Sequence, residues 1–271
     1  MIRRILPALV CIGLVPFDSG VHAQSEVPPA VQAEGEEIVT TSISEDAQRI
    51  LDRAVESMGG RAAFESVTSS RSTCHIALGD LRTTLDLLTW KPDRFKVRHQ
   101  IDGLGVMELG FDGTQGWRKD PPDGLVSEVG PAEAIDYAGR LDLQAMVRDP
   151  AKSYTTISTL PEEIFEDVPC SVLLMSSGDR NARAYFEKAS DLLKGVELYT
   201  PKDRASNRRV IITEWSDAAK MMPLRWVKSF RVEQPRETLE VTYDYVSFND
   251  VSESTFIPPA GLGEPRKDGD G

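Results

Sequence analysis

The stretch that decides the fold runs from Trp90 to Pro121 and reads WKPDRFKVRHQIDGLGVMELGFDGTQGWRKDP. Lys91-Pro92-Asp93 separates two strands, because proline fixes φ and cannot donate a hydrogen bond to a ladder. After this break, one set of residues alternates with arginine, lysine and glutamine, which is the period of a strand with one solvated face. That set is Phe95, Val97, His99 and Ile101.

A hairpin is predicted to follow this strand. The alternation returns at Met107, Leu109 and Phe111, and the next pair, Asp112-Gly113, accepts the positive φ angles of a type I′ turn. A two-residue turn predicts that Trp117 lies opposite Glu108, on the face away from Leu109. A bulge at Gly116 would return Trp117 to the Leu109 face. The sequence leaves both arrangements open.

This stretch resembles the bacterial periplasmic lipoprotein carriers, the LolA-like proteins. In that family a basic residue before a proline, followed by an aromatic residue, opens a strand, and a later Asp-Gly, Trp and Asp-Pro close a hairpin. The matching residues here are Lys91-Pro92, Phe95, Asp112-Gly113, Trp117 and Asp120-Pro121. The carriers usually have arginine before the proline, and lysine lacks its planar fork. The resemblance implies an unclosed barrel with helices in its mouth.

Length and composition predict one exported domain. The chain has 271 residues, and we find no internal repeat and no second domain boundary. Residues 1–23 have the charged start, short apolar run and small-residue cleavage site of a signal peptide, which predicts a periplasmic protein. Residues 24–41 are predicted to be a disordered acidic leader. The LolA-like half-barrel domain is expected over residues 42–257, and a flexible tail over residues 258–271.

The net charge of the chain argues against binding to nucleic acid and against non-specific binding to anionic lipid. The formal net charge is −12, whereas nucleic acids demand a basic face, so no nucleic-acid partner is expected. The same balance fits poorly with non-specific attachment to anionic lipid. After the signal peptide no stretch approaches the length of a membrane span, so no transmembrane segment is expected in the mature chain.

Two helices are predicted. Ser42 and Glu45 form a capping box, and the residues that follow place one apolar face at helical spacing before Gly59-Gly60 ends the helix. Residues 62–67 are expected to add a turn that directs Phe64 inward. A second helix starts at Gly130-Pro131 and ends at Asp149-Pro150.

The rest of the chain predicts strands. About eleven alternating segments are joined by short turns, and hairpin-length connections imply antiparallel pairing. A sheet of this size twists and curls. We therefore expect a mainly β fold: a single curled antiparallel sheet of about eleven strands, an unclosed half-barrel, with two helices covering the concave side.

No catalytic motif is present in the sequence. It lacks a nucleophile elbow, a Ser-x-x-Lys motif, a zinc-protease motif and a phosphate-binding glycine loop. His75 and His99 each lie in an alternating strand without nearby ligands, which favours a solvated or sheet-face histidine over a metal site. We therefore expect a protein that is not an enzyme and that has neither metal nor cofactor.

The large aromatic residues lie in or beside strands. Their simplest interpretation is an ordinary core; the alternative is that some of them line a cavity for acyl chains. For the alternative, the candidate is Lys91 at the cavity mouth, with five wall residues: Trp90, Phe95, Val97, Met107 and Leu109.

These observations leave two functional hypotheses. The first is a non-enzymatic periplasmic carrier or binding protein for lipid, lipoprotein acyl chains or another apolar ligand. The second is an envelope protein-interaction or stress-sensing module that uses the same fold with a filled core and no ligand, because fold does not fix function.

Two cysteines follow the signal peptide, Cys74 and Cys170, and both lie in strand-like segments. An exported protein can form disulfides, so a Cys74–Cys170 bridge is possible. The other interpretation is two unpaired buried thiols.

Overall fold

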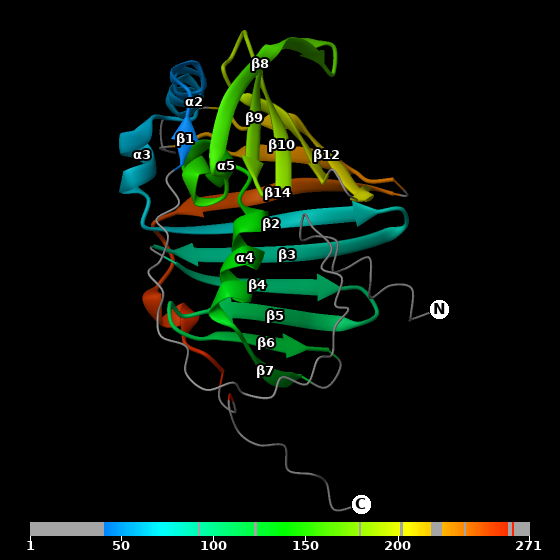
Figure 1. Cartoon of the computed structure of the whole chain (residues 1–271). Coiled ribbons are helices and arrows are strands. Elements are labelled where there is room, and N and C mark those ends of the chain that lie inside the picture. Colours follow the sequence, from blue (N-terminus) through cyan, green and yellow to red (C-terminus); the bar gives the residue numbers. More distant parts are fainter. Residues whose placement is uncertain are drawn as a thin grey trace, which may run out of the picture.

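A computed structural model describes residues 41–259, apart from 92, 122–123, 179, 201–202, 218–223 and 236, together with residue 262. Within this part of the chain, fourteen strands form one sheet in the order β1-β8-β9-β10-β11-β12-β13-β14-β2-β3-β4-β5-β6-β7 (Figure 1). The predicted signal peptide, nearly all of the predicted leader and most of the predicted tail lie outside the described residues.

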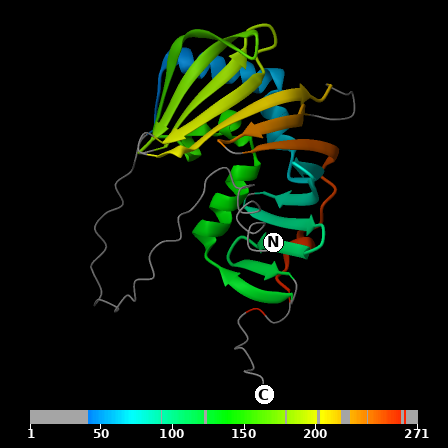
Figure 2. The ribbon, with the colours of Figure 1, turned by 90° about the vertical axis from the view of Figure 1, so that its right-hand side faces the viewer.

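The sheet consists of two antiparallel runs that meet between β14 and β2. The first run is β2 (Ser69–Leu78), β3 (Leu81–Trp90), β4 (Arg94–Ile101), β5 (Gly105–Phe111), β6 (Gly116–Asp120) and β7 (Leu125–Val129). The second is β8 (Thr156–Phe165), β9 (Val168–Ser177), β10 (Arg180–Glu187), β11 (Leu193–Thr200), β12 (Asp203–Trp215), β13 (Val227–Glu233) and β14 (Thr238–Phe248). Figure 2 shows that the two runs bend toward each other, so the sheet curls without closing.

The prediction of a mainly β, unclosed sheet is confirmed, but its details were wrong. The described strands number fourteen instead of eleven, and the sheet is mixed, because β1 (Ser42–Ile43) pairs with β8 in parallel. β1 is too short to show a period. β7 is an edge strand with mostly exposed residues, and β8 contains Pro161 and an irregular register between Leu160 and Glu163, so neither alternates cleanly.

Four α-helices lie in the described part of the chain, where two were predicted: α2 (Glu45–Ser57), α3 (Arg61–Ser66), α4 (Pro131–Leu141) and α5 (Ala145–Arg148). The predicted second helix is broken between α4 and α5. There Asp142 Oδ1 accepts hydrogen bonds from the backbone N–H groups of Gln144 and Ala145, both at 3.0 Å. A side chain that satisfies these N–H groups starts a new helix instead of continuing the old one. Two 3₁₀ turns, η2 (Pro150–Lys152) and η3 (Glu253–Phe256), complete the elements.

The first helix begins two residues later than the predicted capping box. Ser44 is its N-cap and accepts from Ala47 N–H at 3.3 Å, whereas Ser42 belongs to β1. The predicted apolar face is buried, and Gly59 and Gly60 end the helix with positive φ angles. Phe64 in α3 is also buried, as predicted.

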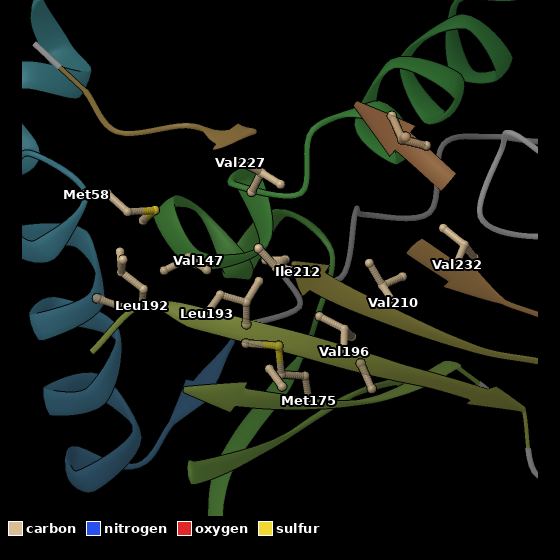
Figure 3. Packing of buried hydrophobic residues seen from close by; sticks show 14 of the residues in the cluster. Met58, Val147, Met175, Leu192, Leu193, Val196, Val210, Ile212, Val227 and Val232 are labelled. Atoms are coloured by element: carbon tan, nitrogen blue, oxygen red, sulfur yellow. The ribbon is translucent and has the colours of Figure 1, made fainter. Parts of the chain in front are cut away.

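The main core lies inside the curl, between the sheet and the helices. In Figure 3, Val147 of α5 and Met58 at the end of α2 lie close to the inner residues Leu192, Leu193 and Ile212. α4 packs on β5 and β6, where a Cβ on Gly116 would come within 3.2 Å of the Ala134 side chain. Helix side chains therefore fill much of the concave side.

The outer face carries two further packed regions. At the first, the β8–β9 hairpin folds over the sheet: Glu166 at its tip forms ion pairs with Arg209 (2.8 Å) and Arg231 (2.6 Å), and Phe165 stacks on Tyr185. At the second, the segment after β14 crosses the outer face of β4. Figure 2 shows this red segment and α4 on opposite sides of the strands.

The Asp112 turn is longer than predicted. Phe111 pairs with Gly116, so four residues form the connection, and Asp112 Oδ1 accepts from Thr114 N–H and Gln115 N–H. Trp117 pairs with Gly110 and lies on the face away from Leu109, two residues along β5 from Glu108, the partner that a two-residue turn would give it. Its indole packs against Gly110, where a Cβ would come within 2.5 Å of the ring.

Candidate functional site

The inner face of β3–β5 brings together four of the predicted wall residues. Phe95 and Val97 pair with Phe111 and Leu109, and Met107 pairs with His99, so all of these side chains share one face. Phe95, Val97 and Leu109 are buried, and Met107 is partly exposed. Trp90 is different: it pairs with Arg94, whereas its neighbour Thr89 pairs with Phe95, so Trp90 lies on the outer face.

Further apolar residues of this inner surface are partly accessible. By register, Leu87 lies beside Val97, Tyr243 beside Cys74, and Phe230 beside Val241. All three residues are partly buried and pack against the main core. The concave side therefore combines a packed centre with an apolar surface that a ligand could contact.

A pocket of about 350 Å³ lies at the junction of α2, α5 and η2. Buried apolar residues form its base, namely Leu51, Val55, Val147 and Pro150. Its other lining residues are mainly polar or charged, including Gln48, Asp52, Arg61, Arg148, Asp149 and Lys152. The pocket is therefore mainly polar at its rim and apolar at its base, and its volume lies at the lower end of the range for small-ligand sites.

Beside this pocket, Arg148 contacts the residues on either side of α5 and a ring on α3. Its guanidinium contacts Asp149 at 2.7 Å and Asp142 at 3.3 Å, and it lies 5.5 Å from the Phe64 ring centroid. Burial alone lowers the pKa of Arg148, but Asp142 and Asp149 outweigh burial and raise it. These charge pairs lie within residues 142–149, and Val147 on the same helix is buried in the main core.

Lys91 lies near this cluster but is not among the residues that line the pocket. Its Nζ donates to the carbonyl oxygen of Phe64 at 2.5 Å, and the carbonyl of Glu65 lies at 3.4 Å. Burial, and then repulsion from Arg148, lowers the pKa of the Lys91 ammonium. These contacts make Lys91 a cap for the C-terminal end of α3, where backbone carbonyls lack helical partners.

The two histidines have different environments. His99 is buried on the inner face, whereas His75 lies on the outer face of β2, where Nε2 contacts Asp244 at 2.6 Å and Nδ1 lies 3.2 Å from Thr84 Oγ1. Sequence reasoning missed this Thr84–His75–Asp244 contact, because β14 is distant in the chain. It lies on an exposed, paired strand surface, where the backbone N–H groups belong to the ladder and do not form an oxyanion hole.

Both cysteines are free in the structure. Cys74 belongs to the inner core, whereas Cys170 belongs to the outer cluster with Phe165 and Tyr185. Burial, followed by the charges of Asp86 and Asp244, raises the pKa of the Cys74 thiol to about 12. Burial also raises the pKa of Cys170.

No helix among the described residues has the length and apolar character needed to cross a membrane. They also contain no group of three or more histidine, cysteine, aspartate or glutamate residues placed to hold a metal ion.

Comparison with solved structures identifies the fold. No family model matches the chain, and a search of curated proteins gave no match. A LolA superfamily protein from Nitrosomonas europaea is similar, with 15% identity, a TM-score of 0.55, and coverage of 78% of this chain and 97% of the other. A DUF1329 family protein from Desulfovibrio piger has 15% identity and a TM-score of 0.55, with coverage of 79% and 98%.

A third similar structure, from Vibrio parahaemolyticus, is described as an outer membrane lipoprotein-sorting protein domain. It has 15% identity and a TM-score of 0.53, and the match covers 77% of this chain and 96% of the other. Together these matches show that the chain has a LolA-like fold, as its sequence predicted. Identities this low establish the fold alone.

Proposed function

We propose that this protein, with its LolA-like fold, is a periplasmic carrier or binding protein for lipid, lipoprotein acyl chains or another apolar ligand. It acts after removal of residues 1–23 and without covalent chemistry. The observation that carries the proposal is the pocket of about 350 Å³, which has an apolar base and lies at the seam between the helices covering the concave side.

The arrangement of the helices supports a route for the ligand. α5 has only four residues, and its Asp142 cap and Arg148 ion pairs lie within residues 142–149. Its links to the rest of the molecule include the buried side chain of Val147 and the hydrogen bond that Gln144 Nε2 donates to the Arg225 carbonyl oxygen at 2.7 Å. Movement of α5 away from α2 would widen the pocket toward the inner surface of the sheet. Each buried methylene then contributes about 0.8 kcal/mol, so a single acyl chain provides enough driving force for binding.

Substitutions at the pocket rim test this proposal. Gln48→Trp and Ala151→Trp each place a large side chain at an exposed lining position, where folding is little affected. We expect at least a tenfold loss of affinity for a fluorescent fatty acid in both variants. Arg49→Trp is the matched control, because Arg49 is exposed on the same helix but does not line the pocket. Equal affinity in all four proteins would contradict the proposal.

A second candidate function is the envelope protein-interaction or stress-sensing module. The dense packing of α2, α4 and α5 against the inner face favours it, because a filled concave side needs no ligand. Native mass spectrometry after mild purification separates the two candidates. A carrier retains lipid, whereas an interaction module is repeatedly free of lipid and recovered with one stoichiometric protein partner.

A further inference from the structure

His99 is a polar residue in an apolar part of the inner wall. It is fully buried and pairs across the ladders with Leu85 on β3 and Met107 on β5. Its Nε2 lies 2.9 Å from the hydroxyl of Thr83, which is also buried. Its Nδ1 is buried as well and has no hydrogen-bond partner among the described residues.

An unpaired ring nitrogen is unfavourable at this position. A buried donor or acceptor without a partner bears its full desolvation penalty, whereas leucine or methionine, as at the neighbouring positions, would bear none. Burial also lowers the pKa of His99 to about 4, so the ring is neutral near pH 7. A neutral Nδ1 can accept from a hydroxyl or donate to a carbonyl, depending on the tautomer.

The neighbour of His99 on β5 is less buried than His99 itself. Met107 lies directly across the ladder from His99 and is partly exposed. Methionine has an unbranched, flexible side chain, so a rotamer change there requires little rearrangement of the surrounding core. One polar group within an otherwise apolar wall is the usual device by which a lipid-sized site fixes the orientation of its ligand.

We propose that His99 is a ligand-positioning residue: its Nδ1 forms a hydrogen bond with an uncharged polar group next to the ligand's apolar chain, as in a monoacylglycerol. This inference rests on the proposed function. A neutral head group fits the site better than a carboxylate, because a charge buried beside a neutral ring would be desolvated without a counter-ion.

Competition between two probes tests the proposal. One is 1-monomyristoylglycerol; the other is the uncharged hydrocarbon dye 1,6-diphenylhexatriene, which has no hydrogen-bonding group. We expect His99→Phe to weaken binding of the monoacylglycerol about tenfold and to leave dye binding unchanged. Equal affinity of wild type and variant for the monoacylglycerol would overturn the role of His99. Failure of the wild-type protein to bind either probe would instead overturn the proposed function.

A measurement on the unmodified protein covers the case in which His99→Phe fails to fold. In ¹⁵N-histidine NMR spectra, we expect 1-monomyristoylglycerol to shift the Nδ1 resonance of His99 and the dye to leave it in place. His75, on the outer face, is the internal reference. An unchanged His99 resonance at saturating monoacylglycerol would overturn the proposal.

Discussion

At the scale of single residues, a structural role of Lys91 at the end of α3 can be distinguished from a role at the cavity mouth. Its ammonium binds the last carbonyl groups of α3, so Lys91→Met removes a charged cap. We expect the free energy of unfolding to fall by about 1 kcal/mol, with little change in ligand affinity. Denaturant unfolding checks this, with Lys228→Met, a surface ion-pair residue, as control. Unchanged stability together with slower ligand release would instead assign Lys91 to the cavity mouth, as the sequence predicted.

His99 also predicts a dependence of stability on pH. Its pKa is lowered from 6.5 to about 4 in the folded protein, so the unfolded chain binds more protons between these values. Stability contributed by the neutral ring is therefore present above about pH 6.5 and is lost as the pH falls toward 4. Wild type should lose about 2 kcal/mol more than His99→Phe between pH 7 and pH 5. Parallel losses in the two proteins would contradict the buried, neutral ring.

The cysteines give a chemical test of the arrangement of the sheet. Cys74 and Cys170 lie in separate clusters, and burial raises both thiol pKa values. We expect slow alkylation of the native mature protein at pH 8, and two reactive thiols after denaturation without reductant. A denatured, unreduced protein with no reactive thiol would show instead that the two cysteines pair.

At the scale of elements, the α4–α5 break depends on one carboxylate. Asp142→Ala removes the acceptor for two N–H groups and should destabilise α5 by about 1 kcal/mol. Hydrogen exchange of the α5 and η2 amides should then be about fivefold faster. Asp142→Asn is the matched control, because asparagine keeps the acceptor and loses only the charge facing Arg148. Equal effects of both variants would mean that the ion pair, and not the cap, holds α5.

The sequence predicted those elements whose side chains face one packed surface. β4 and β5 alternate because one face is core and the other is solvent, and α2 has its apolar face at helical spacing. β1, β7 and β8 were missed because edge position, shortness or an irregular register removes that alternation. The break at Asp142 was missed because a single side-chain cap leaves the apolar spacing on both sides intact.

At the scale of the whole molecule, the curl and the coverage of its concave side were predicted from short turns and amphipathic helices. Four of the five predicted wall residues lie on the inner face. Trp90 does not, because it is three positions from Leu87 on β3, so the alternation of that strand places it on the outer face, where it pairs with Arg94. The pocket could not be predicted, because its lining comes from two stretches far apart in sequence, residues 43–61 and 147–152, that only the tertiary fold brings together.

The central claim is that an apolar chain binds beneath the helices, inside the curl. Photolabelling with a diazirine-bearing acyl lipid, followed by peptide mapping, tests it most directly. We predict labels in α2, in α5 and η2, and at the inner positions around Met107, all suppressed by excess unlabelled lipid. Absence of label, or label confined to the outer face and insensitive to competition, would contradict the account.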